Sequence, residues 1–327
     1  MRRREFIALL GGAAAWPLTA RAQQPAKLVR LGFLSSASVS SPVYKRNLEA
    51  LRAGLRDFGY IEGQNLVIET RWAEDKYDRL PQLAAELVRL DLDVLITHGT
   101  PGTQAAKRAT TTTPIVMAVV GDAIITGLVS SLARPGGNIT GSTFFNPEIS
   151  AKRLELLKEA FPRSSRFGVL VNPTNPITGP IIEAMESSAR SLHVELHGLE
   201  ARSPAEFENA FQSMVDRGVE AATVNEDSMV IANAAAIGQI AVRRRLALIG
   251  FREIADAGGL MAYGILLPAM FRQAAVFVHK LIQGAKPGEI PVEQATRFNL
   301  VINLKAAKAL GLEIPPTLLA RADEVIE

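Results

Sequence analysis

Short apolar segments alternate with amphipathic helical segments along the first half of the chain. Leu48, Leu51 and Leu55 fall at positions i, i+3 and i+7, which is the spacing of one face of a helix. The pattern predicts strands over 29–34, 66–70, 94–97, 115–119 and 138–142, and helices over 43–58, 80–90 and 103–108. Strands that alternate with helices of this length indicate βαβ units and a parallel sheet covered on both faces.

The same alternation starts again after a segment rich in glycine and proline. This segment, 135–147, contains Pro135, Gly136 and Gly137, and helical periodicity lapses there. Beyond it, strands are predicted over 167–171, 194–199, 221–224, 246–249, 260–262 and 300–303, and helices over 149–161, 181–192, 205–217, 230–244, 270–283 and 304–310, the last ending at Gly311. Two such arrays predict an α/β protein with two doubly wound parallel-sheet lobes joined by a hinge.

Loops at the carboxyl ends of the predicted strands carry small polar and charged side chains. In open parallel sheets ligands bind outside these strand ends, so two facing lobes would line one cleft with such loops. Hydroxyl, amide and backbone N–H groups there suit a carboxylate or another small polar group. The candidate ligand-binding residues are Ser35, Ser36, Thr100, Pro101, Asp122, Asn172, Asn225, Asp227, Arg252, Glu253 and Tyr263.

The charged members of this set predict how a ligand would be held. Asp122, Asp227 and Glu253 would take a ligand ammonium, with Arg252 as a counter-charge. The alternative for each Ser, Asn or Asp is a helix cap or a turn former, because these side chains bond to nearby backbone groups. Their convergence on one cleft favours the binding interpretation for the set as a whole.

Catalytic and metal sites are not predicted. The sequence lacks the phosphate-loop, nucleophile-elbow and zinc-protease motifs. His193, Glu195 and His197 would share one face of a strand, but at its early end, away from the cleft. His98 lies at the carboxyl end of a predicted strand and has no evident partner for a general-base role. We therefore expect a protein that is not an enzyme and has no metal or other cofactor.

Composition supports a folded protein and locates its charge. Of the 327 residues, 48% are hydrophobic and 21% charged, which excludes a disordered chain, and the absence of cysteine excludes disulfides and thiolate sites. The net charge of +3 comes from the first 22 residues, where Arg2, Arg3, Arg4 and Arg21 face only Glu5. The remainder carries 32 side chains of each sign, so we expect no nucleic-acid partner.

The first 22 residues have the pattern of an export signal. A basic start precedes a short apolar stretch over 8–16, and Ala20-Arg21-Ala22 fits a cleavage site. The segment 3–7 is similar to a twin-arginine signal. An amphipathic helix packed on the first lobe is the alternative, but the apolar residues show no one-sided period. Cleavage after Ala22 would place the protein in the periplasm.

Several motifs occur in an order that is typical of one family. They are 54–55, 59–60, 63–65, Thr100-Pro101, Asp122 with 127–129, 134–141, 154–158, 168–172, 262–264, 303–308 and 322–326. In this series the chain resembles the solute-binding proteins of ABC transporters of the tryptophan/tyrosine type.

This resemblance implies a type I periplasmic-binding-protein fold with a discontinuous topology. Lobe 1 would comprise 27–141 and 265–292, and lobe 2 would comprise 142–264 and 293–327. It also implies that Ser35, Ser36, Thr100, Pro101, Asp122, Asn172, Asp227 and Tyr263 lie at the ligand cleft.

Three departures from the family pattern count against an aromatic amino acid as the ligand. Gly121-Asp122-Ala123 lacks the proline that commonly follows the aspartate, 225–228 differs from the usual Pro-Thr-Asp-Asn, and 251–253 introduces an Arg-Glu ion pair. Aromatic residues make up only 6% of the chain. The candidates for stacking on a ligand ring are Tyr44, Phe144, Phe145 and Phe251.

The sequence thus predicts an exported, monomeric solute-binding component of an ABC importer. It would capture a small polar or amphipathic molecule, an amino acid or an aromatic carboxylate, by lobe closure and deliver it to a membrane permease. One alternative is an extracytoplasmic sensor module that presents its closed lobes to a receptor. The other is an isomerase on the same fold, which the absence of a cysteine pair disfavours.

Overall fold

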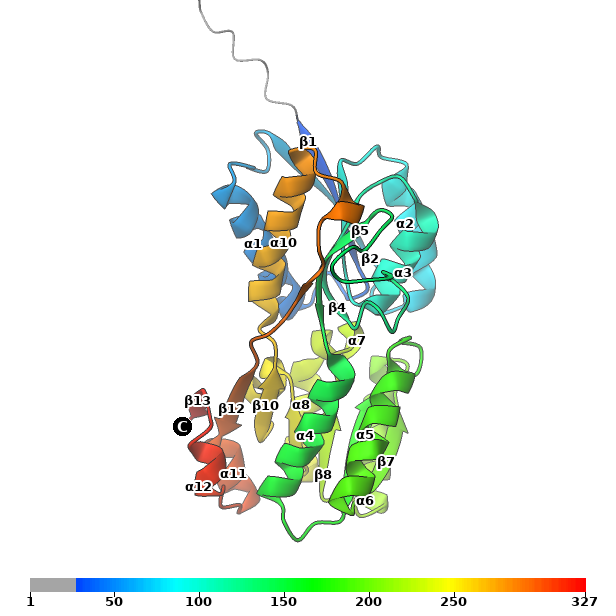
Figure 1. Ribbon diagram of the computed structural model, residues 1–327. Helices are drawn as coiled ribbons and strands as arrows, with labels where there is room; N and C mark the ends of the chain where they lie inside the picture. Colours follow the sequence, from blue (N-terminus) through cyan, green and yellow to red (C-terminus); the bar gives the residue numbers. More distant parts are fainter. Residues whose placement is uncertain (1–27) are drawn as a thin grey trace, which may run out of the picture.

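The computed structural model describes residues 28–327, which form two α/β lobes stacked end to end (Figure 1). The predicted export signal, 1–22, lies outside the described residues. None of the helices over 28–327 combines the length and the apolar character that a membrane span requires.

In the described part of the chain, the sheet of the first lobe has six parallel strands in the order β11-β5-β4-β3-β1-β2. Its strands are β1 (Val29–Ser35), β2 (Leu66–Trp72), β3 (Val94–His98), β4 (Ile115–Gly121), β5 (Ile139–Phe144) and β11 (Glu293–Gln294). Helices α1 (Pro42–Asp57) and α10 (Leu267–Ile282) cover one face, and α2 (Leu80–Val88) and α3 (Thr100–Ala109) cover the other (Figure 1). Strands β3 and β4 are buried along their whole length because both faces are covered.

The second lobe has a seven-stranded sheet in the order β13-β12-β10-β9-β8-β6-β7, in which β12 runs antiparallel to β10. Its strands are β6 (Arg166–Val171), β7 (Glu195–Glu200), β8 (Ala221–Val224), β9 (Ala247–Gly250), β10 (Met261–Gly264), β12 (Asn299–Asn303) and β13 (Glu324–Ile326). Its helices are α4 (Asn146–Ala160), α5 (Thr178–Leu192), α6 (Phe207–Asp216), α7 (Ser228–Ala232), α8 (Ala234–Arg244), α9 (Arg252–Asp256), α11 (Leu304–Leu310) and α12 (Pro316–Leu319). Short 3₁₀ turns lie at Tyr77–Arg79 and Pro287–Glu289 in the first lobe and at Pro204–Glu206 in the second.

The predicted fold class, α/β with two doubly wound lobes, is confirmed. The helix α11 ends at Gly311, which adopts the left-handed conformation (φ 72°) that glycine tolerates best.

The helix predicted over 230–244 is instead two helices, α7 and α8, with a break at Asn233. The Asn233 amide donates to the Met229 carbonyl oxygen, so it competes with the helical hydrogen bonds at this point.

The chain crosses between the two sheets three times. It passes from β5 to α4 at 145, from β10 to α10 at 265–266, and from β11 to β12 at 295–298. Strand β5 continues to Phe144 and β11 pairs with it, so these crossings lie a few residues beyond the boundaries predicted at 141 and 292. Helix α10 returns to the first lobe and packs against α1 (Figure 1).

Candidate ligand-binding cleft

The carboxyl ends of the strands of both sheets face each other across a closed cleft. A cavity of about 30 Å³ lies between Tyr44, His98, Thr100 and Phe144 of the first lobe and, from the second lobe, Asn175, Ile177, Glu226, Ser228 and Ile231. A neighbouring cavity of about 10 Å³ is lined by Asn172, Asn225 and Asp227. Such volumes hold about one or two water molecules, so a larger molecule can enter only when the lobes separate.

The wall from the first lobe is aromatic. The His98 ring stacks on Tyr44, with centroids 4.4 Å apart, and on Phe33, with centroids 5.8 Å apart. Phe271 of α10 closes this cluster behind them, 5.6 Å from the His98 centroid. His98 Nε2 lies 2.9 Å from Ser35 Oγ. Burial lowers the pKa of His98 to about 3, so its imidazole is neutral and packs as a ring.

The wall from the second lobe carries carboxylate and amide groups around Asp227. This residue follows β8 and begins α7, where its Oδ1 accepts from the N–H groups of Met229 (3.0 Å) and Val230 (3.2 Å). Asn175 Nδ2 donates to Asp227 Oδ2 at 2.9 Å. Burial raises the pKa of Asp227, although the hydrogen bonds that it accepts oppose that effect.

Glu226 is fixed beside Asp227 by a buried ion pair. Arg153 Nη1 donates to Glu226 Oε2 at 2.8 Å, and Arg153 Nη2 donates to the other carboxylate oxygen. The Arg153 Nε also donates to the Tyr263 carbonyl oxygen at 2.8 Å. The pair therefore ties the cleft to the end of β10, where the chain crosses between the lobes.

Side-chain contacts join the lobes directly. Tyr77 Oη donates to Asp227 Oδ2 at 2.8 Å, and Asn233 Nδ2 donates to Asp75 Oδ2 at 3.3 Å. Arg46 Nη2 lies 2.7 Å from Glu253 Oε1. Burial and then the charge of Asp227 raise the pKa of Tyr77 well above its usual value.

Gly99 allows the lobes to meet at the start of α3. Its φ of 68° favours glycine, and a Cβ atom there would lie 2.6 Å from Ser228 Oγ of the other lobe.

Several buried polar atoms at the cleft have no hydrogen-bond partner among the described residues. They are Ser36 Oγ, Asn146 Nδ2 and Asn225 Nδ2. Asn225 Oδ1 accepts from Ser150 Oγ at 2.9 Å, which holds the amide so that its NH₂ group is the unsatisfied side. Buried donors without partners are costly, so such atoms mark positions where a ligand can bond.

Most of the predicted site residues lie together at this cleft. Those that line the two cavities or bond to their lining are Ser35, Thr100, Asn172, Asn225 and Asp227. Ser36 is buried next to Ser35, after the end of β1. Pro101 is half-buried next to Thr100 in the first turn of α3. Tyr263 contributes its carbonyl oxygen to Arg153, and its half-buried ring lies 6.0 Å from that of Phe298.

The structure places three predicted residues differently. Asp122 lines neither cavity, because its Oδ1 accepts from the N–H groups of Ile124 and Ile125 at 3.0 and 2.9 Å and caps a turn. Arg252 and Glu253 do not form the expected ion pair with each other. Arg252 bonds to Asp256 (2.8 Å) and to Glu324 of its own lobe, whereas Glu253 bonds to Arg46 across the lobes.

The stacking candidates divide in the same way. Tyr44 and Phe144 line the larger cavity. Phe251 is buried in the core of the second lobe and Phe145 is 41% exposed, so neither of these two lines it.

Sequence reasoning missed Asp75 and Tyr77, which follow β2. This loop is also at the carboxyl end of a strand, so the rule that identified the other loops applied to it as well. Arg46 was missed because it lies on a helix and gains its role only from a residue of the other lobe.

Comparisons with known proteins agree with this fold. A family model described as ABC transporter substrate binding protein matches residues 36–326. A tyrosine-binding protein of Clostridioides difficile strain R20291 is 26% identical over 280 residues, which cover 85% of this chain and 80% of that protein.

Solved structures agree as well. A conserved domain protein from Vibrio cholerae O1 biovar El Tor has a TM-score of 0.85 and 28% identity, over 91% of this chain and 100% of that one. An ABC domain from Streptococcus pneumoniae in complex with L-Trp has the same fold, with a TM-score of 0.82 and 24% identity over 90% of this chain and 100% of that one. Because the family model spans nearly all of the described residues, the chain belongs to the family of ABC transporter substrate-binding proteins.

Proposed function

We propose that this protein is the extracytoplasmic solute-binding component of an ABC importer and that it closes its lobes on an α-amino acid with an aromatic side chain. The observation that carries the proposal is the chemical difference between the two walls of the cleft. One wall offers aromatic rings, and the other offers a buried carboxylate and unsatisfied amide donors.

Each group of an aromatic amino acid has a counterpart in the cleft. Asp227 suits the ammonium group, because an ionised, buried carboxylate makes the strongest bonds to a cation. Asn225 Nδ2 and Ser36 Oγ are free to donate to the carboxylate group. The stacked rings of Tyr44 and His98 suit an aromatic side chain.

Two relatives support the aromatic class, because one is named a tyrosine-binding protein and the other is bound to L-Trp. The side chains that make two of the departures line neither cavity of the cleft, since Asp122 caps a turn before Ala123, Phe251 is in the core, and Arg252 and Glu253 bond to Glu324 and Arg46. They therefore do not weigh against an aromatic ligand. The third departure, at 225–228, keeps the aspartate.

Closure is supported by the contacts that join the lobes. The bonds from Tyr77 to Asp227 and from Arg46 to Glu253 can form only when the lobes are together. A ligand that touches both walls binds this arrangement better than a separated one and shifts the equilibrium toward it.

Isothermal titration calorimetry against L-Tyr, L-Trp, L-Phe and L-Leu tests the proposal. We expect saturable binding of at least one aromatic amino acid at micromolar or lower Kd, with L-Leu at least tenfold weaker, and no new compound after prolonged incubation. Tyramine, which lacks the carboxylate, should bind much more weakly than L-Tyr. Equal affinity for L-Leu and the aromatic amino acids would contradict the assignment of the ligand.

Export belongs to the same proposal. Cleavage after Ala22 would give a periplasmic protein that begins at Gln23, and mass spectrometry of the periplasmic fraction measures that N-terminus directly. A product that keeps residues 1–22 in the cytoplasm would contradict it. Light scattering of the purified protein tests the expected monomer.

A further inference from the structure

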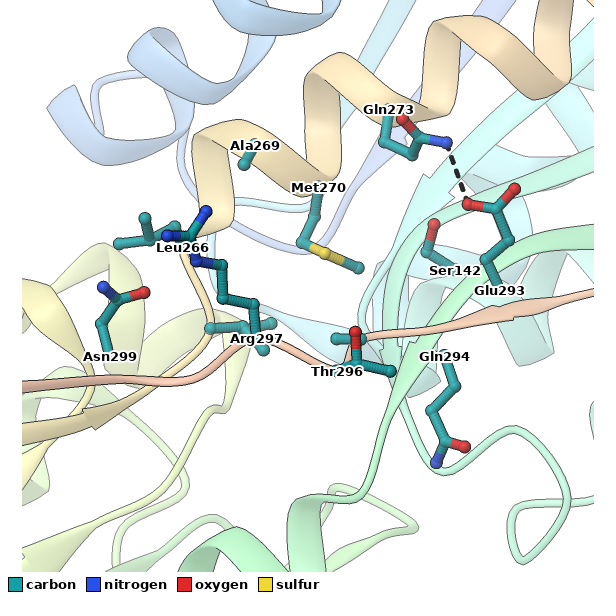
Figure 2. Close-up of a pocket in the computed structure, with 12 residues that line it drawn as sticks. Ser142, Leu266, Ala269, Met270, Gln273, Glu293, Gln294, Thr296, Arg297 and Asn299 are labelled. Atoms are coloured by element: carbon teal, nitrogen blue, oxygen red, sulfur yellow. Dashed lines mark hydrogen bonds between the residues drawn. The ribbon is translucent and has the colours of Figure 1, made fainter.

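A second and much larger cavity lies beside the crossings between the lobes. We call it the hinge pocket; it is lined by Ser142, Ile265, Leu266, Ala269, Met270, Gln273, Glu293, Gln294, Ala295, Thr296, Arg297 and Asn299 (Figure 2). Its volume is about 460 Å³, which is within the range of small-molecule sites. It shares no lining residue with either cavity of the cleft.

One wall of the hinge pocket is apolar and belongs to the crossing at 265–266 and the first turn of α10. Ile265, Leu266, Ala269 and Met270 form this wall. The Met270 side chain points from the helix toward Thr296 in the crossing between β11 and β12 (Figure 2). Leu266 is 41% exposed, so this wall leaves apolar surface in contact with solvent. An apolar ligand body would cover that surface and be stabilised by removing it from water.

The polar side of the hinge pocket includes a buried hydroxyl group without a partner. Ser142 on β5 is only 1% exposed, yet its Oγ has no hydrogen-bond partner among residues 28–327. The side chain points toward α10 (Figure 2). A buried hydroxyl in this position can donate to a ligand oxygen.

The charges around the hinge pocket favour an anion. The Glu293 carboxylate already accepts a hydrogen bond from Gln273 Nε2 at 2.9 Å. Arg297 is exposed, and within the described part of the chain its guanidinium makes no ion pair or hydrogen bond. The Arg297 guanidinium is therefore available to attract the carboxylate group of a ligand.

We propose that the hinge pocket binds a small amphipathic monocarboxylate. Its apolar body packs on Leu266, Ala269 and Met270, and Arg297 and Ser142 bond to its oxygen atoms. This site is separate from the ligand cleft and does not depend on the function proposed for the cleft.

Methionine methyl NMR tests this proposal with benzoate as the probe and benzamide as its uncharged control. The protein has seven methionines, of which Met270 lines the hinge pocket and Met229 is buried beside the cleft. Titration of benzoate should move the Met270 ε-methyl signal in a saturable way and leave the Met229 signal in place. We expect benzamide to bind at least tenfold more weakly.

Two exposed positions provide variants that should not disturb folding. Arg297→Gln should make benzoate as weak as benzamide, because it removes the cation and leaves a shorter, uncharged polar side chain. Ala269→Trp should fill the hinge pocket and abolish the Met270 shift. Ser142→Ala should weaken benzoate binding about threefold, as a single neutral hydrogen bond would.

The opposite results are equally clear. The proposal is overturned if benzoate moves Met229 and leaves Met270 unchanged, because the probe then binds in the cleft. It is also overturned if benzoate and benzamide bind equally, or if binding survives in Ala269→Trp.

Discussion

The two walls of the cleft differ in how their side chains are held. On the first lobe, Tyr44, His98 and Phe33 hold each other by ring stacking, and burial keeps His98 neutral. On the second lobe, Asp227 and Glu226 are held by hydrogen bonds and an ion pair. One wall can therefore select a ligand by shape and the other by charge, and variants on each wall should change binding in different ways.

The largest effect should come from Asp227. Asp227→Asn keeps a side chain that can cap α7 but removes the charge that faces the ligand ammonium. We expect the affinity for aromatic amino acids to fall by 30-fold or more, which corresponds to about 2 kcal/mol or more. Calorimetry at neutral pH measures it.

Asp122 offers a matched control for this variant, because it is also a buried aspartate that caps backbone N–H groups after a strand. Asp122→Asn should leave the affinity unchanged and alter only the thermal stability. A loss of affinity equal to that of Asp227→Asn would mean that the charge selection is not located at Asp227.

Tyr44 tests the aromatic wall. Tyr44→Leu should weaken aromatic amino acids about five- to tenfold, since an aromatic pair contributes about 0.5–1.5 kcal/mol beyond buried area. Any binding of L-Leu should be almost unaffected, and Tyr44→Phe should retain the preference for aromatic ligands. Competition titrations with both ligands measure the ratio, and an equal loss for both would show that this wall does not select rings.

Arg46 tests the contact between the lobes. Its side chain is 54% exposed, so we expect Arg46→Ala to weaken ligand binding only about two- to fivefold, within the usual range of solvent-screened ion pairs. The variant leaves the Glu253 carboxylate buried and unpaired. Arg46→Ala combined with Glu253→Gln should recover part of the loss, and a double-mutant cycle by calorimetry measures the coupling.

The smallest effect should appear in the pH dependence of closure. Burial raises the pKa of Asp75 from 3.8 to about 6, and Asp227 of the other lobe adds to this shift. The closed form therefore binds a proton more strongly than the open form, so closure is most favoured below about pH 4 and loses this contribution as pH rises through about 6.

Burial also raises the pKa of Glu253, which acts in the same direction on closure, whereas protonation of Asp227 would remove the charge that faces the ligand ammonium. The ratio of the ligand affinity of the unchanged protein to that of Asp75→Asn isolates Asp75, and between about pH 4 and 7 this ratio should fall several-fold with rising pH. An unchanged profile in Asp75→Asn would show that Asp75 does not titrate with closure.

Sequence patterns predict the fold well because each long strand and helix carries its own hydrophobic period. They do not predict short elements such as α9 or β13, which span only one or two turns or a few residues. They also do not predict the break that divides the helix expected over 230–244 into α7 and α8, because a local hydrogen bond of the Asn233 side chain causes that break.

The candidate site was predicted in part, because position at a strand end does not distinguish Asp122 from Asp227. Both cap backbone N–H groups nearby. The two aspartates differ because Tyr77, 150 residues away from Asp227 in the chain, donates a hydrogen bond to Asp227 and not to Asp122. The sequence pattern did not indicate the partner of Arg252 for a similar reason, since its pairing with Glu324 depends on how the C-terminal strand β13 packs.

The order of strands in the first sheet has a kinetic consequence. Strand β2, which precedes Asp75 and Tyr77, is at the edge farthest from β5 and β11, where two of the three crossings begin. In the opening that we propose, by rotation about the crossings, this edge would move farthest, so the bonds between Asp75 and Asn233 and between Tyr77 and Asp227 would break early. We therefore expect them to set the dissociation rate of the ligand, and so how long the loaded protein lasts between capture and delivery.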